Sequence, residues 1–204
     1  MQSNVYHFTD TARLPWIIET SELRPDPHRR LGGFPADFLW ATLNAGGDRT
    51  SAAQSGEVKS LYREGLMQLI RITLPGDYFI GWREAVSASP DWTAEHVAIL
   101  ERAARTMGET GIENWCVHLG PLPLSVALAV DARSYLGGRW VPISVHKEFC
   151  TTFAGEPQRR GFVIGSFCYF ATRSTSPEGR TRYGQIGRME VAEQPAIIDR
   201  RQEG

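Results

Sequence analysis

The stretch that most constrains the fold is residues 66–74, LMQLIRITL, in which apolar and polar side chains alternate. Ile70 and Ile72 share one face of an extended chain, and the polar side chains between and beyond them share the other. This period of two predicts a half-buried β-strand. Two shorter runs, NVYHFT at residues 4–9 and FLWATLN at residues 38–44, predict further strands. The chain must therefore build a sheet.

Helical signals stand between these strands. Residues 93–111, TAEHVAILERAARTMGETG, carry apolar side chains at helical spacing, with Thr93 as the first residue and Gly108 as a natural stop. A shorter helix is expected over residues 10–23, where Pro15 falls in or next to the first turn. Strands and helices of this kind along one chain predict the α+β class.

The C-terminal part differs in character from the rest. Residues 162–193 predict a strand, a Ser/Pro/Gly turn and one or two further strands, and residues 45–60 predict a polar loop. About 60 residues with one apolar cluster bury too little surface to stand alone. We therefore expect one domain over residues 1–204, with a core at about 4–143 and a β-rich extension at 145–204.

Composition limits the classes of function. The formal net charge is −1, from 22 basic and 23 acidic residues, so nothing in the balance demands a nucleic acid or an anionic membrane. Apolar runs fall short of the roughly 18 residues that cross a bilayer, and we expect no signal peptide, because a basic region followed by an apolar one is missing from the first residues. Three cysteines without a CxxC pair predict a cytoplasmic protein without a disulfide framework or a metal site.

Three stretches in order carry a resemblance: YHFT, LWAT and the segment ENWCVHLGPLP, residues 113–123. Together they resemble the ADP-ribosyltransferase fold, particularly the DarT-like toxins and the related RNA 2′-phosphotransferases. Those families begin with a YHxT strand and a helix, and a later strand starts at an acidic residue and leads to a proline. Here the acidic residue is Glu113 and the proline is Pro123. The poly(ADP-ribose) polymerases use a similar strand, and the resemblance covers roughly residues 4–143.

The resemblance implies a split mixed β-sheet with peripheral helices, and an enzyme of bacterial or phage type that transfers ADP-ribose from NAD to a macromolecular acceptor, nucleic acid or protein. Glu113 is then the catalytic residue. Its carboxylate would bind the ribose 2′-hydroxyl and stabilise positive charge on the ribose as nicotinamide leaves. Strand parity would place Glu113 beside Trp115 and Val117; alternatively, it is an exposed glutamate at the start of a strand.

The resemblance also implies residues that bind NAD. His7 would hydrogen-bond the adenosine ribose, with Thr9 on the same face of the strand. Trp40 and Thr42 would line the cleft from the second strand, although Trp40 is equally a core residue.

Cations and an aromatic ring complete the expected site. Arg71 and Arg49 are candidates for the diphosphate, and Tyr62 is the candidate ring that stacks on nicotinamide. The chain departs from the family in lacking a tyrosine directly after its second strand. Two other interpretations stay open. One is an RNA 2′-phosphotransferase, against which the missing basic excess counts. The other is a non-catalytic binding domain that keeps the fold.

Overall fold

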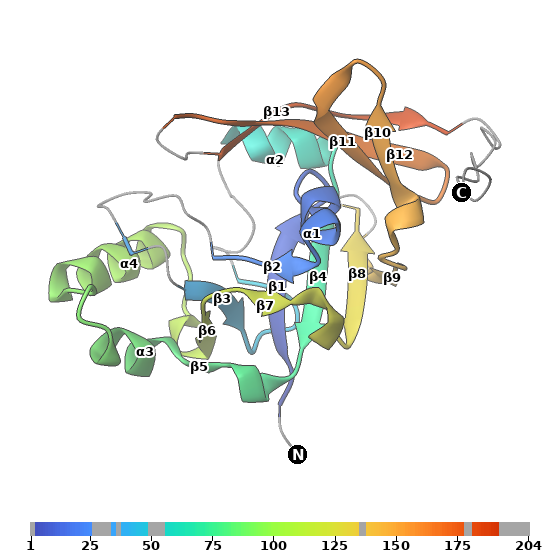
Figure 1. The fold of residues 1–204 in the computed structure, drawn as a ribbon. Coiled ribbons are helices and arrows are strands. Elements are labelled where there is room, and N and C mark those ends of the chain that lie inside the picture. The colour runs from blue at the N-terminus through green and yellow to red at the C-terminus, as the bar shows by residue number, and fades with distance from the viewer. Residues whose placement is uncertain are drawn as a thin grey trace.

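A computed structural model describes residues 3–25, 34–35, 38–48, 56–134, 138–177 and 181–191 of the chain. It contains a seven-stranded sheet, a four-stranded sheet, a two-stranded ladder and short helices (Figure 1). The α+β class predicted from the sequence is confirmed.

The seven-stranded sheet forms the centre of the molecule. Its strands run in the order β5-β6-β3-β1-β4-β8-β9. Their bounds are β5 (Ile80–Gly81), β6 (Trp115–Leu119), β3 (Phe38–Thr42), β1 (Val5–Asp10), β4 (Leu69–Leu74), β8 (Ala129–Arg133) and β9 (Val141–Pro142). Every pairing among the described residues is antiparallel. The expectation of a mixed sheet is therefore wrong for this part of the chain, because consecutive neighbours here pair in opposite directions.

The sheet opens between β1 and β3. β1 pairs with β4 at six successive positions, from Val5 to Asp10, whereas its register with β3 consists of the single pair Tyr6 and Thr42. Strands that separate in this way leave backbone polar groups that need other partners. The sheet is consequently divided into two halves, which meet at Tyr6.

One face of the sheet is covered by α1 (Leu14–Thr20) and by the ladder of β2 (Glu22–Leu23) and β7 (Leu122–Pro123). α1 carries Pro15 in its first turn and ends at Ser21, which has the left-handed conformation. The main apolar core lies between these layers. Its fully buried side chains include Leu14, Leu23, Leu39, Ile70, Ile72, Leu74 and Leu122.

The other face is covered at one end by α3 (Trp82–Ala88) and α4 (Ala94–Thr106). α4 begins at a capping box, in which the Thr93 hydroxyl accepts from the His96 backbone N–H and the Thr93 N–H donates to the His96 ring. The second core cluster lies under these helices and is aromatic. It contains Phe38, Trp40, Trp82, Trp92 and Trp115.

The four-stranded sheet is built from β10 (Cys150–Phe153), β11 (Glu156–Ile164), β12 (Phe167–Thr175) and β13 (Thr181–Glu190) in that order. It packs on the α1 side, where Phe162 enters the main core and the guanidinium groups of Arg160 and Arg173 stack on Trp16. Figure 1 shows it beyond α1, away from α3 and α4. The C-terminal part is thus β-rich and bears directly on the N-terminal part.

One helix lies where the sequence predicted a loop. α2 (Gly56–Arg63) occupies part of the segment expected to be a loop, and its Tyr62 packs with Met67, Ala12 and Ala171 in a third apolar cluster. Tertiary packing therefore stabilises a helix whose composition is polar. Short 3₁₀ turns complete the structure: η1 (Gly76–Tyr78), η2 (Ile112–Asn114), η3 (Leu124–Val126) and η4 (Lys147–Phe149).

Candidate functional site

His7 lies at the opening between β1 and β3, on the face covered by α1. Its Nδ1 is 2.8 Å from the backbone carbonyl oxygen of Trp40. A carbonyl oxygen can only accept, so Nδ1 carries the hydrogen and donates. In the neutral ring Nε2 is then an acceptor. This bond replaces a ladder bond that the separated strands do not make.

The charge state of His7 follows from its surroundings. Burial lowers the pKa of His7 below its ordinary value of 6.5, the hydrogen bond to the Trp40 carbonyl opposes this, and the positive charge of Arg13 lowers the pKa further. His7 is therefore neutral at pH 7. A neutral imidazole with a fixed Nδ1–H presents Nε2 to a hydroxyl donor.

The other residues expected on the first two strands divide between the two faces. Thr9 is buried on the His7 side, whereas Trp40 and Thr42 point to the opposite side. Trp40 packs edge-on against Trp92 and Trp115 in the aromatic cluster. The backbone N–H of Asn44 donates to the Thr42 hydroxyl at 3.1 Å. Thr42 therefore helps to fix the turn that follows β3.

Asp48 is a buried carboxyl group that the sequence interpretation missed. Its side chain forms hydrogen bonds with Thr42, Asn44 and Trp115. Burial raises the pKa of Asp48, which these hydrogen bonds partly offset and the nearby charge of Glu109 reinforces. The sequence does contain a signal for the turn that precedes Asp48, because Asn and Gly favour turns. The Asn44 side chain accepts from the Gly46 backbone N–H and donates to the Gly47 carbonyl.

Arg71 is already engaged within the protein. Its guanidinium forms an ion pair with Asp131 at 2.9 Å, donates to the Ala45 carbonyl at 2.8 Å, and stacks 4.6 Å from the ring centroid of Trp140. Arg71 thus joins β4, β8 and the turn after β3. Arg49, the other arginine expected at the diphosphate, lies outside the described residues.

Tyr62 belongs to the third cluster, between α2 and the four-stranded sheet, and not to the β1–β3 opening. Its hydroxyl is buried and has no hydrogen-bond partner among the described residues. Burial raises the pKa of Tyr62 above its ordinary value, and the nearby charge of Asp10 adds to this effect. The structure does not bring Tyr62 together with the other expected residues.

Glu113 lies in η2, immediately before β6, and not in the strand as expected. The strand begins only at Trp115. The backbone N–H of Leu43, beyond the end of β3, instead donates to the Asn114 carbonyl at 2.9 Å. The Glu113 side chain is 71% exposed.

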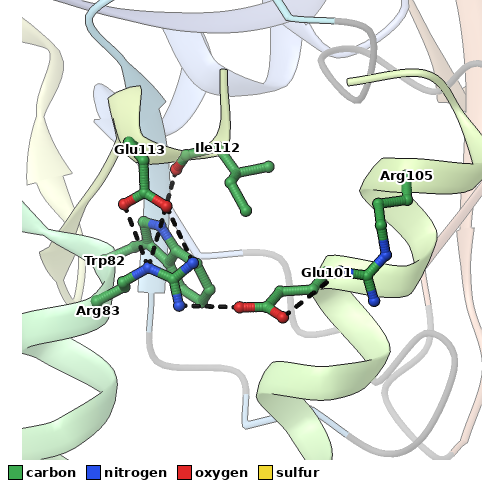
Figure 2. A network of polar contacts seen from close by, with 6 residues as sticks. All are labelled: Trp82, Arg83, Glu101, Arg105, Ile112 and Glu113. Atoms are coloured by element: carbon green, nitrogen blue, oxygen red, sulfur yellow. Dashed lines mark hydrogen bonds and ion pairs between the residues drawn. The ribbon is translucent and has the colours of Figure 1, made fainter. Parts of the chain in front are cut away.

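The carboxylate of Glu113 is held by Arg83, from the first turn of α3. Arg83 Nη2 lies 3.0 Å from Oε1, and Nε lies 3.3 Å from Oε1 and 3.2 Å from Oε2 (Figure 2). These hydrogen bonds lower the pKa of Glu113, although burial slightly opposes them. The group is consequently ionised at neutral pH.

Arg83 is shared with a second carboxylate. Its Nη1 donates to Glu101 on α4 at 2.9 Å, and Glu101 is also 3.8 Å from Arg105. The guanidinium stacks 4.5 Å from the ring centroid of Trp82, whose indole N–H donates to the Ile112 carbonyl at 2.8 Å. Figure 2 shows two side chains of α3 contacting η2: Trp82 contacts the Ile112 carbonyl, and Arg83 contacts the Glu113 carboxylate.

His7 and Glu113 lie near the same end of the central strands, on opposite sides. Tyr6, Thr42 and Trp115 are at one level across β1, β3 and β6. The strand of His7 and the strand that follows Glu113 are therefore two strand spacings apart, about 10 Å, and Glu113 precedes that level by two residues in η2. The imidazole lies on the α1 face, and the carboxylate is held on the side of α3 and α4.

The described residues contain neither a cluster of metal ligands nor a cysteine of lowered pKa. No group of three or more His, Cys, Asp or Glu side chains there could hold a metal ion, and His146, Glu148 and Cys150 do not form one. Burial raises the pKa of Cys116 to about 12 and that of Cys150 to about 11, which disfavours thiolate nucleophiles. No helix in the described ranges has both the length and the apolar character needed to span a membrane.

Comparisons with known proteins identify no relative. No protein-family model matches the chain, and searches of curated proteins and of solved structures find no significant match.

Proposed function

We propose that the protein is an NAD-dependent ADP-ribosyltransferase that acts on a macromolecular acceptor, with an ADP-ribosyltransferase-like fold of the DarT type. NAD is its substrate, His7 binds the adenosine ribose, and Glu113 acts on the nicotinamide ribose. The proposal starts from the motifs YHFT, LWAT and ENWCVHLGPLP.

One observation carries the proposal. The strands that bear the three motifs are immediate neighbours, in the order β6-β3-β1, although up to 70 residues of chain lie between one motif and the next in the printed sequence. The sheet also opens beside His7, as a split sheet requires. The adjacency of the three motif-bearing strands supports the proposal.

In this structure His7 and Glu113 lie on opposite sides of the sheet, and the proposal requires both to contact one dinucleotide. Its two riboses are joined through a diphosphate, so one ligand can bind a group at the opening and a second group at the start of β6. His7 Nε2 would accept from a hydroxyl of the adenosine ribose. For Glu113 to meet the other ribose, its carboxylate must turn away from Arg83.

The proposed reaction requires few groups of the protein. The bond from the ribose C1′ to the nicotinamide nitrogen breaks, the electron pair leaves with nicotinamide, and the ribose becomes oxocarbenium-like. An ionised carboxylate at the 2′-hydroxyl stabilises that charge. A nucleophilic atom of the acceptor then bonds to C1′ and loses its proton to solvent.

The direct test is nicotinamide release from NAD, with and without cell lysate. Slow release in buffer and fast release with lysate, accompanied by ADP-ribose on a macromolecule, would support the proposal. No release under either condition and no NAD binding at millimolar concentration would refute it.

A specific observation favours a second candidate, a non-catalytic binding domain. His7 Nδ1 and the Glu113 carboxylate both have partners within the protein, the Trp40 carbonyl and Arg83, so neither of these two groups needs a ligand to be satisfied. This candidate predicts no nicotinamide release under any condition.

A further inference from the structure

The contact between Arg83 and Glu113 opposes the role proposed for Glu113. A carboxylate stabilises an oxocarbenium ion through its negative charge and its free oxygen lone pairs. Arg83 places a positive charge 3.0 Å from Oε1 and also lies 3.2 Å from Oε2. In this arrangement the negative charge of the carboxylate is paired with Arg83, and the group is turned away from the α1 face, where His7 lies.

Arg83 keeps a second partner if Glu113 leaves. Its Nη1 is 2.9 Å from Glu101 on α4, and its guanidinium stacks on Trp82. Trp82 is 1% exposed and is fixed to the Ile112 carbonyl, so the platform under Arg83 stays in place. Release of Glu113 therefore leaves the guanidinium paired and supported, which avoids the cost of an unpaired charge.

The release itself requires little energy. Arg83 is 45% exposed and Glu113 is 71% exposed, and an ion pair so accessible to water is weak. A ligand that offers Glu113 a hydroxyl donor and a nearby positive charge competes readily with Arg83.

On the basis of the proposed function, we infer that Arg83 is a positioning residue for Glu113, which it withholds from the site until substrate binds. Glu101 is the alternative partner that takes Arg83 when Glu113 is released. The two carboxylates compete for one guanidinium. Removing Arg83 therefore frees Glu113, whereas removing Glu101 leaves Arg83 to Glu113 alone.

This inference predicts opposite effects of two substitutions on one network. Arg83→Gln frees Glu113 and raises kcat/KM for nicotinamide release about two- to fivefold at low salt, the range for an exposed ion pair. Glu101→Gln leaves Arg83 with Glu113 alone and lowers kcat/KM by a similar factor. The double variant behaves as Arg83→Gln, because Glu101 acts only through Arg83.

The experiment compares these variants with wild type at ionic strengths of about 0.01 M and about 0.15 M. Salt raises wild-type turnover and leaves Arg83→Gln nearly unchanged. Arg102→Gln, which removes an exposed arginine from α4 outside this network, is the matched control and is expected to behave as wild type. Urea unfolding of each variant checks that the fold is retained.

Glu113→Gln in the same series separates the two proposals. If Glu113→Gln loses activity while Arg83→Gln is slower than wild type, or if the two effects add in the double variant, the inference about Arg83 is wrong and the proposed function stands. If Glu113→Gln is as active as wild type, Glu113 is not the catalytic residue and both fail.

Discussion

The Trp40 carbonyl on β3 accepts a hydrogen bond from His7 Nδ1 on β1, at the point where the two strands no longer pair. A side chain thus satisfies a backbone group that the opened sheet leaves unpaired. The bond also fixes the tautomer of His7, so that Nε2 is the free acceptor.

His7 makes stability depend on pH in a defined direction. Because the folded pKa lies below the ordinary 6.5, the unfolded chain binds the proton first as pH falls. Stability is therefore lost below about pH 6.5, with a slope of up to about 1.4 kcal/mol per pH unit from this group. His7→Gln removes the titration but keeps an amide donor for Trp40, so its unfolding free energy should vary less between pH 7.5 and 5.5. If the unfolding free energies of the two proteins, measured in urea, change with pH in the same way, His7 does not titrate on unfolding.

The sequence predicted elements whose signals are local. α4 was predicted from Thr93, its apolar spacing and Gly108, and β4 from the alternation around Ile70; both are confirmed. α2 was missed because its polar sequence becomes helical only through packing of Tyr62 against distant residues.

The site was less predictable, because it depends on contacts remote in sequence. The sequence pattern placed Glu113 on the strand β6, but Glu113 lies in the 3₁₀ turn η2, where the alternation of a strand does not apply. Nothing local connects Glu113 with Arg83, 30 residues away. Asp48 was missed because its hydrogen-bond partner Trp115 is remote in sequence, although its turn with Asn44 was visible in the sequence.

Phe162 tests how the four-stranded sheet is attached. Its side chain is fully buried in the main core, although it belongs to β11. Phe162→Ala should lower the free energy of unfolding by about 3–5 kcal/mol, through lost burial and the cavity left behind. Val163→Ala, at the next position and only half-buried, is the control and should cost less. Equal losses in urea unfolding would mean that the sheet is not fixed to the core through Phe162.

The Arg71–Asp131 pair predicts a non-additive effect on stability. The two side chains are 17% and 10% exposed, so Arg71→Met leaves a carboxylate with little solvent, and we expect a loss of about 3 kcal/mol. Adding Asp131→Asn removes that charge and should restore part of the loss. Thermodynamic cycles from urea unfolding measure this coupling. If the two losses simply add, the pair does not act as a unit.

Glu113→Gln tests the central claim most directly. The substitution keeps the shape of the side chain and removes its charge, which the proposed reaction requires only in the transition state. The account predicts nicotinamide release that is about 10²–10³ slower than wild type, with NAD affinity changed much less. His7→Ala should do the reverse, weakening NAD binding more than turnover at saturation. Release by Glu113→Gln at the wild-type rate would contradict the account and make Glu113 a structural residue.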